Sequence, residues 1–183
     1  MAYFFFDFKD TGKQDSRALL SSLLVQLSDL SERFCDVLLG LHSAHQNGLE
    51  QPSDESLAWC LKNMLTSSGQ LPIYLIMDAL DECPNDAGIP SSREKVLNLV
   101  KELVELHLPN LHLFVTSRPE FDIRTTLEPL ATQQVSLHDE SGQQHDIIDY
   151  VTSVVLSDAI MTKWRDDDQN MVIEKLTEKA DGM

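Results

Sequence analysis

Ile73-Tyr-Leu-Ile-Met-Asp-Ala-Leu-Asp-Glu82 is an apolar run that ends in three carboxylates, and it sets the architecture of the chain. Pro72 bounds the five apolar residues on one side and Asp78 bounds them on the other. A short run between such boundaries is typical of a strand buried on both faces of a parallel sheet. Asp78 then lies at the carboxyl end of the strand, the edge at which open α/β sheets place their ligand sites.

A second apolar run, Leu111–Thr116, ends in the polar sequence Thr116-Ser-Arg118. As a neighbouring parallel strand, it brings hydroxyl groups and a guanidinium to the same edge as Asp78. A guanidinium binds phosphate oxygens in two places, and an Asp at this edge can hold Mg²⁺, usually through water. The two runs therefore predict the acidic and phosphate-sensing half of a nucleotide site. The alternative is structural coincidence, in which Asp78 only caps the following turn.

These motifs resemble the NACHT class of signalling ATPases, in particular the fungal NACHT proteins with a nephrocystin-like N-terminal domain. The resemblance implies a three-layer α/β/α sandwich around a P-loop NTPase-like parallel sheet, incomplete here and followed by an all-helical segment. It also implies ATP and Mg²⁺ as cofactors, and an ATP-dependent switch in non-self recognition or cell-death signalling. The residues that carry it, in the family's order, are Tyr3-Phe-Phe-Phe-Asp-Phe8, Asp78-Ala-Leu-Asp-Glu-Cys83, Thr116-Ser-Arg-Pro-Glu120 and Lys179-Ala-Asp-Gly-Met183.

The resemblance assigns roles to five residues. Asp78 matches the Walker B acid and is the expected Mg²⁺ ligand. Asp81 and Glu82 are the expected catalytic acids, because the position directly after Asp78, where related ATPases often have Glu, holds an alanine. Thr116 and Arg118 are expected to bind nucleotide, with Arg118 sensing the γ-phosphate. The alternative for Arg118 is a salt bridge to Asp78 or Glu82.

A glycine-rich Walker A loop is absent from these 183 residues. The nearest candidate, Thr11-Gly-Lys13, has Asp7 where a P-loop requires Gly, and Gln14 where it requires Ser or Thr, so it is expected to be a turn. Without backbone amides and a lysine around the phosphates, most nucleotide affinity is lost. Whether the chain is an enzyme is left open, with little or no activity expected. The alternative function is a non-catalytic, truncated interaction protein that pairs with a complete NACHT protein or another partner.

The composition limits the classes of binding partner and the cellular locations that we expect for the protein. Fourteen basic and thirty acidic residues give a net charge of −16, which opposes binding to nucleic acid and to anionic membranes. No apolar run approaches the roughly 20 residues that a membrane span needs. Three cysteines without a signal peptide indicate a reduced, cytoplasmic location.

Periodicity predicts alternating strands and helices up to His138, then helices alone. We expect a partial nucleotide-binding core over residues 1–138 and the start of a helical lid over 139–183. A leucine stripe in the first helix is expected to pack on the sheet, with a partner-helix surface as the alternative. The stripe comprises Leu19, Leu20, Leu23, Leu24, Leu27 and Leu30. The predicted strands are 2–8, 73–77, 111–116 and 134–137, and the predicted helices are 16–30, 32–43, 54–66, 91–107, 123–127, 141–155 and 169–180.

In the family, the Walker A strand lies inside the sheet, so its absence implies a strand with an unpaired edge. Such edges recruit other chains. We therefore expect a protein partner or self-association through the open sheet edge, a rearranged strand order, or a chain that is stable only within a longer protein.

Overall fold

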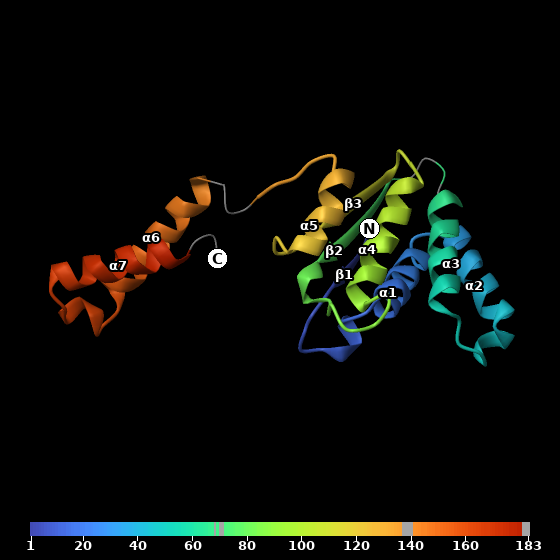
Figure 1. Ribbon diagram of the computed structural model, residues 1–183, viewed down its shortest axis with the longest axis horizontal. Helices are drawn as coiled ribbons and strands as arrows, with labels where there is room; N and C mark the ends of the chain where they lie inside the picture. The colour runs from blue at the N-terminus through green and yellow to red at the C-terminus, as the bar shows by residue number, and fades with distance from the viewer. Residues whose placement is uncertain (68, 70–71, 137–140, 181–183) are drawn as a thin grey trace. The chain divides into compact units, whose positions relative to one another are not determined.

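The computed structural model describes residues 1–67, 69, 72–136 and 141–180, in two compact units that comprise residues 1–131 and 132–183. Figure 1 shows their helices and strands. The strands are β1 (Ala2–Phe5), β2 (Ile73–Asp78) and β3 (Leu111–Val115). The helices are α1 (Ser16–Ser28), α2 (Glu32–Ala44), α3 (Asp54–Ser67), α4 (Ser92–Glu105), α5 (Phe121–Leu127), α6 (Ser141–Ser157) and α7 (Asp166–Ala180).

The first unit is an α/β fold built on a parallel sheet, as predicted. In the described part of the chain, the sheet has three strands in the order β1-β2-β3. Ala2 of β1 is in register with Leu75 of β2, which is in register with Leu113 of β3. Because β2 and β3 run parallel, Asp78 and Thr116 are brought to the same edge. The C-terminal segment is helical, also as predicted.

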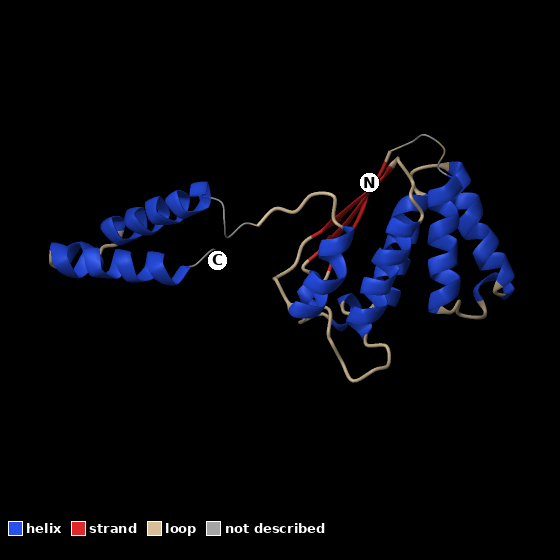
Figure 2. Ribbon diagram, turned by 45° about the horizontal axis from the view of Figure 1, so that its top comes forward, coloured by secondary structure: helices blue, strands red, loops and turns tan. Residues whose placement is uncertain are grey.

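Helices pack on one face of this sheet. Two successive right-handed crossovers that step in the same direction place their helices on the same side. The inward side chains of β1 and β2 form one core with the apolar faces of α1, α3 and α4, and Figure 2 shows α2, α3 and α4 on the same side of the strands. The prediction that strand 73–77 is buried on both faces is therefore wrong, since Tyr74 on the other face is 40% exposed. Of the three expected layers, the described part of the first unit contains two.

The leucine stripe of α1 packs into the core, as predicted. Leu19, Leu23 and Leu27 are fully buried, whereas Leu30 is half exposed because the helix ends at Ser28. Asp15 begins the helix by accepting a hydrogen bond from the backbone N–H of Ala18 at 2.8 Å. Ser91 caps α4, since its Oγ accepts a hydrogen bond from the Glu94 N–H at 3.1 Å.

Two predicted strands are wrong in extent. β1 ends at Phe5, because Asp7 begins a turn in which Asp10 N–H donates to the Asp7 carbonyl at 3.1 Å. The predicted strand 134–137 is not a strand in its described part: residues 134–136 are irregular, without a neighbouring strand among the described residues. Leu137 lies outside the described residues.

The second unit is a helical hairpin. α6 and α7 pack together, with Val155 buried between them. Buried Gln169 donates a hydrogen bond to the Met161 carbonyl at 2.7 Å, which ties α7 to the connecting turn. None of the helices described in either unit is long and apolar enough to span a membrane.

Candidate functional site

The carboxyl ends of β2 and β3 place Asp78 beside Thr116. The Thr116 hydroxyl donates a hydrogen bond to Asp78 Oδ1 and accepts one from the Ala79 N–H at 3.0 Å. The backbone continues the ladder on both sides, with Thr116 N–H donating to the Met77 carbonyl and Leu80 N–H donating to the Thr116 carbonyl, each at 3.0 Å. The sheet itself therefore fixes the relative position of the acid and the hydroxyl.

Ala79 turns the chain sharply after β2. Its φ of 55° lies in the left-handed region, which residues other than Gly seldom adopt. The chain enters a short 3-10 turn, Leu80–Glu82, that carries the other two acids. Strain of this kind occurs where the surrounding structure holds a functional geometry.

Asp81 is the partner of Arg118. Asp81 Oδ1 accepts from the Arg118 N–H at 3.0 Å, and Oδ2 lies 3.5 Å from Arg118 Nε. The predicted alternative, a salt bridge from Arg118 to Asp78 or Glu82, therefore named the wrong acids. The Asp81 side chain is 9% exposed and the Arg118 side chain is 81% exposed, so the acid is held by the loop while the guanidinium extends into solvent.

Glu82 connects the site to the turn that follows β1. Its Oε2 accepts a hydrogen bond from the Phe8 N–H at 3.1 Å. Across the described residues, no three His, Cys, Asp or Glu side chains converge so that they could hold a metal ion. Asp78 with its Thr116 partner thus fits Mg²⁺ that is held mainly by water and phosphate oxygens, but not a metal caged by several protein ligands.

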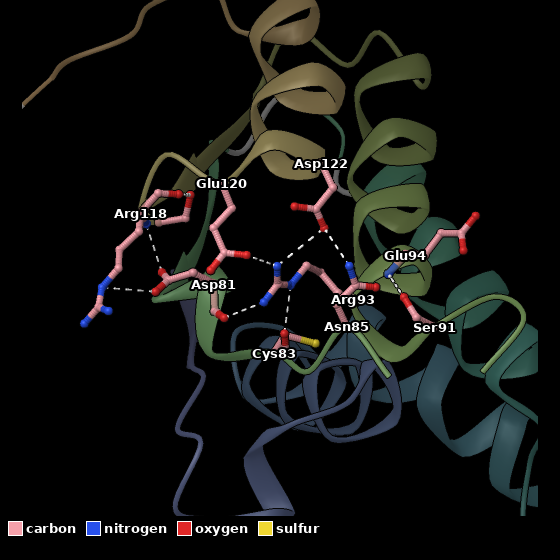
Figure 3. Close-up of polar contacts among 10 residues, drawn as sticks. Asp81, Cys83, Asn85, Ser91, Arg93, Glu94, Arg118, Glu120 and Asp122 are labelled. Atoms are coloured by element: carbon pink, nitrogen blue, oxygen red, sulfur yellow. Dashed lines mark hydrogen bonds and ion pairs between the residues drawn. The ribbon is translucent and has the colours of Figure 1, made fainter. Parts of the chain in front are cut away.

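Arg93, which the sequence reasoning missed, connects the two loops of the site (Figure 3). It lies in the first turn of α4 and is 6% exposed. Arg93 Nε donates to the Cys83 carbonyl at 2.8 Å, and Nη2 donates to the Asp81 carbonyl at 2.6 Å. Nη1 pairs with Glu120 and lies 3.4 Å from Asp122 Oδ2. The sequence did contain one signal for these contacts. Arg93 is a cation in the first turn of a predicted helix, where it opposes the helix dipole, and acidic partners offset that unfavourable interaction.

A family model described as "Nephrocystin 3, N-terminal" matches residues 1–118. The chain belongs to the nephrocystin 3 N-terminal family. The matched segment runs from β1 through Arg118, so it contains all five predicted site residues. No curated protein and no solved structure matched the chain.

Among the described residues of the nephrocystin 3 N-terminal segment, few positively charged or N–H groups besides Arg118 are available to bind phosphate. Thr11–Lys13 is a short 3-10 turn in which Asp10 accepts from the Gly12 N–H at 3.0 Å. Lys13 lies 3.5 Å from the same carboxylate. The turn thus directs an amide and a lysine at its own acid, so the residues present fit the Mg²⁺ side of an ATP site but not its phosphate cradle.

Cys83 is buried beneath the acidic loop of this family segment. Its Sγ donates to the Gln14 carbonyl at 3.2 Å. Burial raises the pKa of the Cys83 thiol from 9.0 to about 12. A thiol that keeps its proton at neutral pH is a poor nucleophile, so Cys83 supports the loop and does not act as a catalytic group.

Proposed function

We propose that the chain is the acidic and sensor half of a NACHT-type nucleotide-binding signalling module, which binds ATP weakly in these 183 residues alone. The observation that carries the proposal is the hydrogen bond from Thr116 to Asp78 across the carboxyl ends of two parallel strands. Membership of the nephrocystin 3 N-terminal family supports the same assignment. In this proposal Asp78 holds Mg²⁺, Arg118 meets phosphate oxygens, and Asp81 and Glu82 supply the catalytic acids. Thr116, which the sequence assigned to nucleotide binding, acts by positioning Asp78, because its hydroxyl proton is donated to that carboxylate. The switch would act in the cytoplasm, where the free thiols of the chain remain reduced.

Calorimetric titration with ATP and Mg²⁺ tests this proposal. We expect weak binding that Asp78→Asn and Arg118→Ala each abolish, because one holds the metal and the other a phosphate. Arg124→Ala is the matched control, since Arg124 is an exposed arginine on α5 that pairs with Glu128 of the next turn.

The variants separate the possible results. Binding that survives both Asp78→Asn and Arg118→Ala would contradict the proposed site. The absence of heat at millimolar ATP would mean that the acids and the sensor do not bind nucleotide without a phosphate cradle, which favours the alternative below.

The alternative is a non-catalytic interaction protein that pairs with a complete NACHT protein, another partner or its own copy through an open edge of the sheet.

The two edges of the sheet differ in whether their backbone groups are already hydrogen-bonded. At the β1 edge, Gln26 of α1 donates to the Tyr3 carbonyl at 2.7 Å and accepts from the Tyr3 N–H at 3.0 Å, so a side chain occupies the position of a missing strand.

The β3 edge is the open one. Thr116 and Asn110 direct their backbone groups to β2. Alternate residues of a strand direct their backbone groups to opposite sides, so Leu113 and Val115 direct theirs outward, whereas the Leu111 N–H donates to the Leu108 carbonyl at 3.1 Å. In the described parts of the chain, no strand pairs with β3 on that side. A strand edge in this state recruits another strand, and this favours β3 as the pairing edge.

A further inference from the structure

Arg118 combines an exposed side chain with a backbone that is held on both sides. Its N–H donates a hydrogen bond to Asp81 Oδ1 at 3.0 Å, and its carbonyl accepts one from the Glu120 N–H at 2.8 Å. The Ser117 hydroxyl also donates to that carbonyl, at 2.9 Å. The base of the Arg118 side chain is therefore fixed, while most of the guanidinium faces solvent, where an anion can reach it.

Arg93 holds the two residues that bind the Arg118 backbone. Its Nη2 donates to the Asp81 carbonyl at 2.6 Å, and its Nη1 pairs with the Glu120 carboxylate. Figure 3 shows Asp81 and Glu120 between the two arginines. Arg93 is thus connected to Arg118 by two routes, one through the loop after β2 and one through the loop after β3.

The guanidinium of Arg93 is suited to holding both loops at once. It is buried, and its Nε is fixed by the Cys83 carbonyl at 2.8 Å. A guanidinium presents five N–H donors in one rigid plane, so it can bind two carbonyls and a carboxylate in a set geometry. Water competes little with these hydrogen bonds in a buried site.

A fixed backbone favours phosphate binding by Arg118. A long side chain loses conformational freedom when it binds a ligand, and this ordering reduces affinity. A loop that is already held in place has less freedom to lose. The contacts of Arg93 therefore lower the cost of bringing the Arg118 guanidinium to a phosphate.

We propose that Arg93 is a positioning residue for Arg118, which it orients toward a γ-phosphate through Asp81 and Glu120. The inference deepens the proposed function by adding a buried residue that acts through others. Its phosphate-binding part rests on the proposed function. The positioning of the Arg118 backbone does not, and it can be measured without nucleotide.

The first measurement is amide hydrogen exchange, followed residue by residue by NMR in the full chain without nucleotide. Arg93→Lys keeps the charge but loses the planar fork. We expect the Arg118 and Glu120 amides to exchange about tenfold faster, the effect of weakening one hydrogen bond. The Thr116 amide, which donates to the Met77 carbonyl within the sheet, should be unchanged. If Arg93 only stabilised the fold, exchange would instead rise throughout the sheet, because it would follow global unfolding.

Two matched variants test the route through Glu120. Glu120→Ala and Asp122→Ala each remove one acidic partner of Arg93, but only Glu120 also binds the Arg118 backbone. We expect faster exchange at the Arg118 amide in Glu120→Ala and little change in Asp122→Ala. Asp81→Ala removes the acceptor of this amide and is the positive control.

The second measurement is calorimetric titration with ATP and Mg²⁺, at a temperature at which far-UV circular dichroism shows every variant to be folded. Arg93→Lys should weaken binding about two- to tenfold, which corresponds to the ordering cost of one side chain. Arg124→Lys makes the same replacement at an exposed arginine of α5 and should leave the affinity unchanged.

Unchanged exchange at Arg118 in folded Arg93→Lys, or exchange that rises equally at Thr116, would overturn the inference. ATP binding that is equally strong in wild type and Arg93→Lys would overturn it as well. If wild type binds no ATP, the proposed function fails, and the exchange rates alone decide whether Arg93 positions Arg118. Glu120→Ala carries the same test if Arg93→Lys does not fold.

Discussion

Arg93 joins the loop after β2 to the loop after β3, and its replacement tests how much this junction contributes to stability. Arg93→Ala removes hydrogen bonds to the carbonyls of Asp81 and Cys83 and leaves Glu120 and Asp122 without their cation. We expect the free energy of unfolding to fall by about 3 kcal/mol, as for the loss of one partner from a buried charged network. Urea unfolding measures this change.

Two further variants separate geometry from charge. Arg93→Lys keeps the positive charge but loses the planar fork, so it should recover only part of the loss. Arg124→Ala should change stability by no more than about 0.5 kcal/mol, because its pair with Glu128 is exposed and within one helical turn. Equal stability of Arg93→Ala and wild type would show that the two loops are held by other contacts.

At the residue scale, the sequence predicted where the site residues lie in the fold better than it predicted which residues they bind. Asp78 and Thr116 each end an apolar run, so a parallel sheet has to bring them to one edge. The partner of Arg118 was missed because the left-handed turn at Ala79 sets the direction of Asp81, and no periodicity in the sequence encodes that turn. The contacts of Arg93 join segments that come together only in the folded chain.

At the scale of elements, Gln26 determines whether the β1 edge is closed. Gln26→Ala removes both hydrogen bonds to the backbone of Tyr3. We expect a loss of about 1–2 kcal/mol in unfolding free energy and faster hydrogen exchange at the Tyr3 amide, which then faces water. Gln51→Ala, in the exposed loop before α3, is the control. An unchanged exchange rate at Tyr3 would contradict the closed edge.

The helices were predictable because the apolar periodicity and the capping residues indicated the same helical segments, as at Ser91 before α4 and along the leucine stripe of α1. The strands were harder to predict. The run Ile73–Met77 is apolar at every position, so the pattern could not show which face the helices cover. Which face is covered depends on the order of the strands. When successive crossovers move along the sheet in the same direction, their helices all lie on one face and leave the other face open. Residues 134–136 have a composition typical of a strand, but in the described structure they do not pair with a neighbouring strand, so they do not form one.

For the whole molecule, the open β3 edge and the net charge of −16 act in opposite directions on self-association. Backbone pairing at the edge favours it, whereas two copies of the chain repel each other. The repulsion depends on ionic strength: the Debye length falls from about 30 Å at 0.01 M salt to about 10 Å at 0.1 M. Salt therefore separates the two effects without altering the sequence.

We expect sedimentation equilibrium to show a weight-average mass that rises with salt and protein concentration. His112→Lys places a charge on an exposed side chain of β3 and should keep the chain monomeric, because a lysine on an edge strand disfavours pairing with a second strand. Val25→Lys adds the same charge on the exposed side of α1, where Val25 is 57% exposed, and should retain the association. Equal behaviour of the two variants would mean that net charge alone governs association. A mass that stays monomeric at every salt concentration would show that β3 does not pair with a second copy, which leaves the edge to a different partner.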